Sequence, residues 1–307
     1  MRKNLKKITV SLLAAVLILM GLIIKEELTG FGVNSQASLP AESRLAVYFL
    51  DVGQGDASLI ITPSAQKILI DGGPDTSVLD KLGANLSFFD RKIDAVVLTH
   101  PHADHLNGLI EVVKRYEVGK IYYTGAISNS PAFLEFLQII KDKEITLEIV
   151  DTPRDLDFGD GAILKFIYPF EKKDIDEAGD LNDTSIVNRL VFGRKSFLFM
   201  GDAEIPVENK ILNYEVDVAS DIIKIGHHGS SSSSSEEFLT AVNPQYSVIS
   251  VGENNSFGHP HLSVVRRLER LGIDIFRTDE DEQISIFSDG DNLEIFSGKS
   301  GGKPLQN

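Results

Sequence analysis

Short apolar runs, separated by glycine or proline, recur along the chain from residue 44 onward. Runs of this length that are rich in β-branched and aromatic residues predict strands. The last two expected strands read as edge strands. The expected strands are 45–52, 57–63, 67–73, 93–100, 120–125, 145–150, 162–169, 185–193, 195–202, 221–229, 246–252, 273–278 and 283–288.

Segments with apolar residues at helical spacing lie between these strands, and they predict helices at 77–89, 106–116, 131–143, 236–242 and 262–272. Pro131 suits the first turn of its helix. The serine run 230–235 is of low complexity and predicts a mobile loop that ends in a helix N-cap. Because strands and helices alternate without a linker, a single α/β domain with two packed sheets is the simplest interpretation.

Composition narrows the classes of function. The 307-residue chain has 42% hydrophobic residues, enough for a large core, and a formal net charge of −15. This acidity argues against a broad sequence-independent grip on nucleic acid, so a polyanionic substrate would need metal ions or a local basic patch. The absence of cysteine excludes disulfides, iron–sulfur clusters and thiolate zinc sites.

The N-terminus has the layout of a secretion signal. MRKNLKK precedes an uncharged run, Ile8–Ile24. We expect residues 1–24 to be a signal anchor or signal peptide, residues 25–43 a tether, residues 44–297 the domain, and residues 298–307 a flexible tail. Because the positive charges stay inside, the protein is expected in the cell membrane with one span and its domain outside. Cleavage and secretion, or a buried helix of a cytosolic protein, are the alternatives.

All seven histidines fall in three short clusters, which predicts one shared site. The first cluster is THPHADH at 99–105, after an apolar strand. The second is His227 and His228, after another apolar strand, and the third is His259 and His261. Asp202 ends a further apolar strand. His100 and His102 can bind one ion through imidazole nitrogen, whereas Asp104 and His105 can face a second. A carboxylate such as Asp202 can bridge two ions about 3.5–4 Å apart.

THPHADH also matches the HxHxDH signature of the metallo-β-lactamase superfamily. Together with FLDVGQGDASLI, ILIDGGP, NDTSIVNRL, FLFMGDAE, KIGHHGSSSSSSEEFL and NNSFGHPHLSVVRRL, it resembles the hydrolase domain of ComEC-type DNA-internalisation competence proteins from about residue 45 to residue 287. The resemblance implies a four-layer αββα sandwich with a binuclear metal centre at one edge.

One departure affects the ligands that the resemblance implies. Many superfamily members carry another ligand histidine where this chain has Asn182 to Ser185, and the HHG motif would fill that place. The resulting assignment gives His100, His102 and His228 to one ion and Asp104, His105 and His259 to the other, with Asp202 bridging. His227 and His261 are the alternatives within their pairs. The residues expected to orient ligands or contact substrate are Asp56, Asp71, Asn182, His227 and His261.

The expected chemistry is hydrolysis by hydroxide generated on two divalent ions, Zn²⁺ or Mn²⁺, with Asp104 and Asp202 as the catalytic carboxylates and Asp104 accepting a proton. A phosphodiesterase or nuclease is favoured, with DNA as the first substrate by resemblance. The alternatives are a cell-envelope phosphoester hydrolase, such as a phosphorylcholine esterase, and a metal-binding module without catalysis.

Overall fold

The computed structural model describes residues 44–301. The expected span at 1–24 and tether at 25–43 lie outside the described residues, as do residues 302–307. Among the described residues, no helix combines the length and apolarity needed to cross a bilayer.

The first sheet has eight strands in the order β15-β14-β1-β2-β3-β4-β5-β6. Neighbours pair antiparallel from β15 to β3 and parallel from β3 to β6. The strands are β1 (Leu45–Phe49), β2 (Ser58–Ile61), β3 (Lys67–Ile70), β4 (Lys92–Leu98), β5 (Glu117–Tyr123), β6 (Thr146–Ile149), β14 (Ile284–Ser288) and β15 (Leu293–Ser297).

The second sheet has seven strands in the order β13-β12-β11-β10-β9-β8-β7. It is parallel from β13 to β10 and antiparallel from β10 to β7. The strands are β7 (Arg154–Asp157), β8 (Ala162–Tyr168), β9 (Val187–Phe192), β10 (Lys195–Phe199), β11 (Ile222–Lys224), β12 (Tyr246–Ile249) and β13 (Asp274–Arg277).

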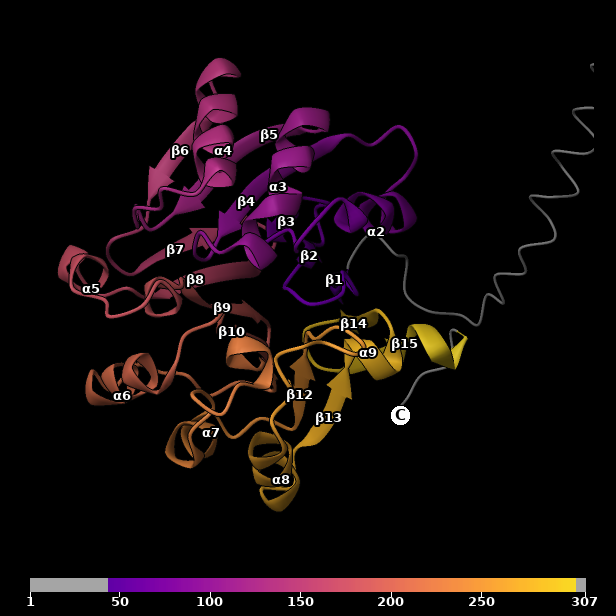
Figure 1. The fold of residues 1–307 in the computed structure, drawn as a ribbon. Helices are drawn as coiled ribbons and strands as arrows, with labels where there is room; N and C mark the ends of the chain where they lie inside the picture. Colours follow the sequence, from indigo (N-terminus) through magenta and orange to yellow (C-terminus); the bar gives the residue numbers. More distant parts are fainter. Residues whose placement is uncertain (1–43, 302–307) are drawn as a thin grey trace, which may run out of the picture. The chain divides into compact units, whose positions relative to one another are not determined.

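Helices cover the outer face of each sheet, as Figure 1 shows, so the expected four layers are confirmed. Helices α2, α3 and α4 lie on the first sheet, and α6, α7 and α8 on the second. The helical segments are α2 (Ser77–Asn85), α3 (Ala103–Arg115), α4 (Pro131–Asp142), α5 (Lys172–Asp176), η2 (Asn182–Thr184), α6 (Ile205–Asn213), η3 (Gly226–Gly229), α7 (Glu236–Val242), α8 (Leu262–Arg270), α9 (Thr278–Asp281) and η4 (Gly298–Ser300).

Strand β4 shows why its sequence is almost continuously apolar. Val96 and Leu98 face the core under the helices, whereas Ala95 and Val97 face the core between the two sheets. A strand buried on both faces cannot alternate polar and apolar residues. Its rigid surroundings also fix the position of the segment that follows, which carries the histidines of THPHADH.

Several local expectations differ from the structure. Strand β14 is an interior strand because β15, which the sequence pattern did not reveal, pairs along its outer side; β13 is an edge strand as expected. Helix α2 ends at Asn85, before an exposed pair of phenylalanines. The turn η4 occupies the first residues of the segment 298–307, which had been interpreted as a tail.

The serine run is packed rather than mobile. Ser233, Ser234 and Ser235 are buried, and the Glu208 carboxylate of α6 accepts hydrogen bonds from the backbone N–H groups of Ser234 and Ser235. Ser235 caps α7 by accepting a bond from Phe238 N at 3.2 Å, as predicted. Arg267 of α8 donates to the carbonyl oxygen of Ser234. A polar run can be ordered when a distant carboxylate satisfies its backbone.

Candidate metal centre

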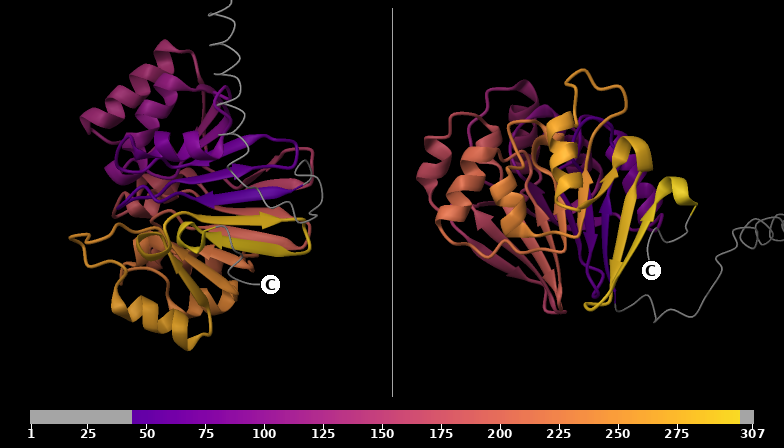
Figure 2. Two further views of the ribbon diagram at one scale, coloured as in Figure 1. Left: turned by 90° about the vertical axis from the view of Figure 1, so that its right-hand side faces the viewer. Right: turned by 90° about the horizontal axis from the view of Figure 1, so that it is seen from below.

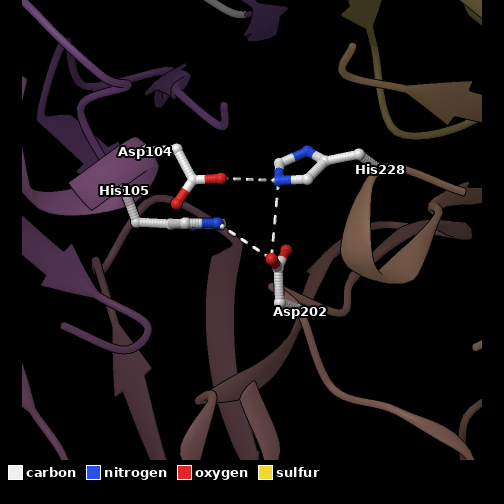
Figure 3. A group of neighbouring side chains, drawn as sticks. All are labelled: Asp104, His105, Asp202 and His228. Atoms are coloured by element: carbon white, nitrogen blue, oxygen red, sulfur yellow. Dashed lines mark hydrogen bonds and ion pairs between the residues drawn. The ribbon is translucent and has the colours of Figure 1, made fainter. Parts of the chain in front are cut away.

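The three strand ends singled out in the sequence meet at one edge of the two sheets. His100 follows β4, Asp202 follows β10, and His228 follows β11. Asp104 and His105 lie in the first turn of α3, which begins directly after His102. Figure 3 shows Asp104, His105, Asp202 and His228 pointing toward one another from these separate elements.

The Asp202 carboxylate is the centre of this group. Its Oδ2 atom lies 3.2 Å from His105 Nε2 and 3.4 Å from His228 Nε2, and His228 Nε2 lies 3.2 Å from Asp104 Oδ2. One ligand atom from each of the four residues falls within 4.8 Å of the others. The arrangement can hold a metal ion, and it differs from the expected assignment, which grouped His228 with His100 and His102.

His100 and His102 form the adjoining part of the site. Their rings meet edge to face with centroids 4.7 Å apart, and His100 Nε2 lies 3.0 Å from His102 Nδ1. On its other side, His100 Nδ1 is within hydrogen-bonding distance of the hydroxyl groups of Thr99 and Ser185, at 3.1 and 3.3 Å. Ser185 belongs to the segment where the resemblance implied a missing histidine.

The two imidazoles of the HHG turn approach Asp202 from different directions. His227 and His228 both have positive φ, 48° and 52°, so successive side chains diverge instead of following strand or helix geometry. His228 Nε2 lies 3.4 Å and His227 Nε2 lies 3.9 Å from the same oxygen, Asp202 Oδ2. Both histidines therefore border the Asp202 carboxylate.

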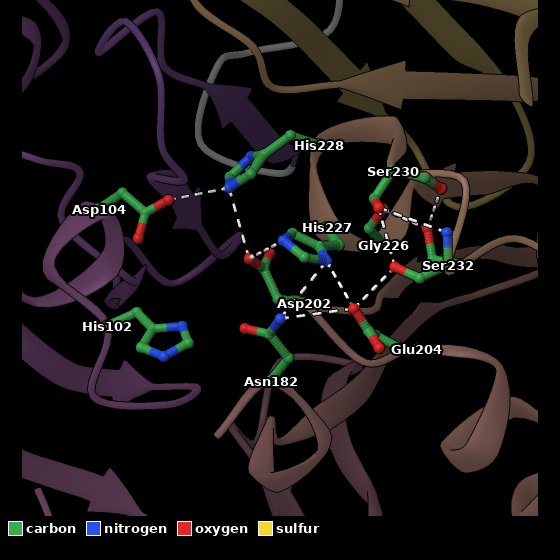
Figure 4. Close-up of polar contacts among 12 residues, drawn as sticks. His102, Asp104, Asn182, Asp202, Glu204, Gly226, His227, His228, Ser230 and Ser232 are labelled. Carbon is green, nitrogen blue, oxygen red and sulfur yellow. Dashed lines mark hydrogen bonds and ion pairs between the residues drawn. The ribbon is translucent and has the colours of Figure 1, made fainter. Parts of the chain in front are cut away.

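Glu204 orients His227, and sequence reasoning missed this residue. Glu204 Oε1 accepts a hydrogen bond from His227 Nδ1 at 2.9 Å and another from the Ser232 hydroxyl at 2.7 Å (Figure 4). Asn182 Nδ2 lies 3.5 Å from the same oxygen. A carboxylate on Nδ1 leaves Nε2 as the ligand atom, which is a common arrangement around metal-bound histidine. The signal in the sequence was an acidic residue two positions after Asp202.

Buried groups hold the other imidazoles. Asp71 accepts hydrogen bonds from His105 Nδ1 at 2.8 Å and from the backbone and hydroxyl of Thr99, so it touches a candidate ligand histidine as expected. His228 Nδ1 donates to the carbonyl oxygen of Ser250 at 2.9 Å and lies 3.3 Å from Asp56 Oδ1. Both imidazoles thus present Nε2 to Asp202.

Lys224 is a second residue that the sequence analysis overlooked. Its side chain is 3% exposed and forms an ion pair with Asp56, while Nζ donates to the carbonyl oxygen of Gly201 at 3.0 Å and lies 3.9 Å from Asp202 Oδ1. Lysine is almost never fully buried without a partner. A single lysine inside the apolar strand that precedes the HHG motif was the available signal.

The third histidine cluster divides between two roles. The His259 ring lies 5.5 Å from that of His227 and 6.3 Å from that of His228. The His261 side chain instead caps α8 by accepting a hydrogen bond from Ser263 N at 3.3 Å. Of this pair, His259 is the residue whose imidazole reaches the site.

Electrostatics at the centre are strongly coupled. Burial acts to lower the pKa of His105 and His228, but the adjacent Asp202 carboxylate and further carboxylates raise both pKa values well above 6.5. Burial acts to raise the pKa of Asp202, yet these two histidines hold it well below 3.8. Burial, with the neighbouring His105, lowers the pKa of His100. The field beside Asp202 therefore favours positive charge.

The residues present fit divalent ions. Three buried atoms, Asp202 Oδ1, His105 Nε2 and His259 Nδ1, have no hydrogen-bond partner within the described part of the chain. Buried polar atoms are normally paired, so unpaired atoms on these candidate ligand residues favour a bound cation. Imidazole and carboxylate ligands without thiolate suit zinc or manganese.

Comparison with known proteins finds relatives among competence proteins. ComE operon protein 3 of Bacillus subtilis (strain 168) is 29% identical over 256 residues, covering 78% of this chain and 32% of that protein. Competence protein ComA of Neisseria gonorrhoeae is 31% identical over 254 residues, covering 82% of this chain and 33% of that protein. The chain thus spans about a third of the length of the curated relatives it matches.

Solved structures show the same fold at low identity. A CmlA β-hydroxylase E377D mutant matches with a TM-score of 0.52 and 16% identity, over 81% of this chain and 54% of that one. The metallo-beta-lactamase fold protein YhfI from Bacillus subtilis matches with a TM-score of 0.50 and 12% identity, over 78% of this chain and 99% of that one. The profile described as "Metallo-beta-lactamase superfamily" matches residues 50–253, and the chain therefore belongs to that superfamily.

Proposed function

We propose that this protein is a metal-dependent phosphodiesterase that hydrolyses DNA. The observation that carries the proposal is the convergence of Asp104, His105, Asp202 and His228 within 4.8 Å at one edge of the fold. The competence proteins among its relatives support DNA as the substrate. Phosphodiesters also suit an acidic chain, because metal ions can neutralise an anionic group that the protein charge would otherwise repel.

The geometry leads us to revise the ligand sets. We assign Asp104, His105 and His228 to one ion because His228 Nε2 approaches Asp104 and Asp202 together. We assign His100, His102 and His227 to the other ion, since Glu204 turns His227 Nε2 toward Asp202. Asp202 borders both sets. His259, whose ring packs beside His227 and His228, is assigned to the substrate side of the centre.

When bound, two divalent ions supply a water of lowered pKa and polarise a phosphoryl oxygen. The protein's own part is orientation and proton transfer. Asp71, Ser250 and Glu204 fix the rings of His105, His228 and His227 through their Nδ1 atoms. Asp104 uses Oδ2 toward His228, and its other oxygen is assigned to accept the proton of the attacking water. Burial opposes ionisation of Asp104, but His228 and His105 lower its pKa, so it is ionised at neutral pH.

We also propose that the catalytic domain works outside the cytoplasm, attached through the apolar segment Ile8–Ile24. The support is the cationic stretch before the segment and the uncharged run itself. Protease added to intact cells should digest the domain, whereas a domain protected until the cells are lysed would contradict this placement.

A substrate panel tests the proposed activity. Purified full-length protein loaded with Zn²⁺ or Mn²⁺ is assayed on plasmid DNA, single-stranded oligonucleotides, bis-p-nitrophenyl phosphate and a choline phosphodiester, with bound metal quantified in parallel. We expect DNA cleavage that requires metal. Hydrolysis of the choline diester without DNA cleavage would point to a cell-envelope substrate, and inactivity with metal bound would indicate a non-catalytic module.

Asp202→Asn supplies the matched test of the site. This change should abolish turnover and reduce bound metal, because it removes a charge from the carboxylate between the two ligand sets. Asp155→Asn is the control, since Asp155 lies on β7 and its side chain is 55% exposed. A fully active Asp202→Asn protein would falsify the assignment of this centre.

A further inference from the structure

The loop between β12 and α8 projects from the body of the domain, as the views in Figure 2 show. The Asn255 side chain stabilises the shape of this loop. Asn255 Oδ1 accepts hydrogen bonds from Phe257 N at 3.2 Å and His259 N at 3.0 Å, and Asn255 Nδ2 donates to the carbonyl oxygens of Gly252 and His259 at 3.1 and 2.6 Å. These bonds hold the backbone of the loop from Gly252 to His259.

Phe257 belongs to this loop and is 67% exposed. Its ring lies nearly parallel to that of His259, with an interplanar angle of 24° and centroids 5.9 Å apart. His259 in turn lies beside His227 at the metal centre. The loop thus links an exposed aromatic face to the reactive centre through one intervening ring.

The other exposed phenylalanines of the described chain are in a different place. Phe88 and Phe89, 77% and 90% exposed, lie in the loop that leads into the beginning of β4, whereas the catalytic histidines follow the end of that strand. Phe257 is therefore the exposed phenylalanine at the catalytic edge of the described residues. Single exposed apolar side chains are common on protein surfaces, so what singles out Phe257 is its stacking against His259 beside the candidate metal centre.

We propose that Phe257 stacks against a nucleobase next to the phosphodiester being cleaved, and that the substrate is a strand whose bases are free to stack. This inference rests on the proposed phosphodiesterase function and adds the substrate class. Base stacking on aromatic side chains contributes sequence-independent binding. It also needs no basic groove, which a chain with a net charge of −15 does not readily offer.

Base stacking on Phe257 favours single strands over duplexes. Bases inside a duplex are already stacked on both faces, so their use by Phe257 would require unstacking that costs a few kcal/mol. A glycerol-phosphate or ribitol-phosphate polymer has no planar ring to place on Phe257. Choline recognition by aromatic cages uses several ring faces around the cation. Among the described residues, the one ring pairing recorded for Phe257 is with His259.

The first experiment crosses variant with substrate. Wild-type protein, Phe257→Ala and Phe89→Ala are assayed on a dT oligonucleotide, on a matched strand of abasic deoxyribose phosphates and on a choline phosphodiester. For Phe257→Ala we expect kcat/KM on dT to fall about 5- to 150-fold, the equivalent of about 1–3 kcal/mol per stacked base, through KM rather than kcat. On the abasic strand the two variants and the wild type should be equal.

A direct signal of stacking comes from Phe257→Trp. The chain has no tryptophan, so this substitution adds a single fluorophore at the proposed contact. Titration with a phosphorothioate dT strand, which slows cleavage, should quench its emission, and the abasic strand should leave it unchanged. Phe89→Trp is the matched control, and its emission should respond to neither strand.

The outcomes separate this inference from the function on which it rests. If the wild type cleaves plasmid DNA but neither strand, the single-strand inference fails while the function stands, and if it cleaves no phosphodiester at all, the proposed function fails. If the wild type cleaves dT and Phe257→Ala does so with equal kcat/KM, the stacking proposal is overturned while the function stands. If Phe257→Ala instead loses activity on a choline diester alone, the occupant is a quaternary ammonium group and the nucleobase is ruled out.

Discussion

Replacing Lys224 with methionine tests whether the buried ion pair between Lys224 and Asp56 stabilises the fold beside the candidate metal centre. Methionine keeps an unbranched chain of similar length and removes the ammonium. The change removes the lysine partner of Asp56, whose side chain is 6% exposed, leaves His228 as its neighbour, and deprives the Gly201 carbonyl of a donor. Although burial acts to raise the pKa of Asp56, Lys224 and His228 lower it, so the residue is an anion in the folded protein.

Breaking a buried pair by removing one partner typically costs about 3–5 kcal/mol, because the remaining charge stays buried. We therefore expect Lys224→Met to lower the free energy of unfolding by about 3–5 kcal/mol, a large share of the roughly 5–15 kcal/mol of a typical domain. Urea denaturation of full-length protein, followed by circular dichroism with chelator present, measures the change without a contribution from bound metal.

A double-mutant cycle separates loss of the pair from loss of packing. In Lys224→Met with Asp56→Asn, both charges are gone, so the loss should be smaller than the sum of the two single losses, with a coupling energy of about 0.5–3 kcal/mol. Additive losses, or a Lys224→Met protein within about 0.5 kcal/mol of wild type as for ordinary surface substitutions, would refute the reasoning.

Three further predictions follow from other contacts. Burial raises the pKa of Glu208 above its ordinary 4.5, so its protonated form stabilises the fold at low pH, and this contribution is lost as pH rises through the folded pKa. Glu208→Gln should therefore gain stability relative to wild type as pH rises from 4.5. A pH-independent difference in urea midpoints would contradict this. In Gly108→Ala the new Cβ would lie 1.8 Å from the Gly72 carbonyl oxygen, so the free energy of unfolding should fall by about 1–3 kcal/mol, as measured by thermal unfolding. Gly83 in α2 has open space where a Cβ would lie, so Gly83→Ala should raise the free energy of unfolding by about 0.8–1 kcal/mol. Chelation of metal should lower the melting temperature by removing about 2.7 kcal/mol if the metal had been present at 100 times its Kd, and an unchanged melting temperature after verified metal removal would count against a bound ion.

Much of the fold could be predicted because local pattern and global packing agree. The apolar strand before THPHADH, the helical spacing of 106–116 and the proline at the start of 131–143 each match an observed element. Strand β15 escaped prediction, and β14 was misplaced as an edge strand, because strand pairing depends on a partner elsewhere in the chain. Composition likewise misled for the serine run, whose order comes from Glu208 in another helix.

The sequence indicated which residues would cluster better than how they would be arranged. The residue types of THPHADH and the carboxylate of Asp202 indicated a cluster, and the structure brings them together. Sequence spacing could not show that His227 and His228 diverge, because that depends on two successive residues with positive φ. Glu204 and Lys224 were overlooked because their importance comes from contacts across the fold rather than from a motif.

The direction of β1 decides where the described chain enters the domain relative to the candidate metal centre. Through the antiparallel partners β2 and β3, β1 runs the same way as β4, so Leu45 begins at the edge opposite to the one where His100 follows β4. The anchor proposed above would therefore join the domain at the edge away from the candidate metal centre. The edge that carries the candidate ligands would then be left for substrate.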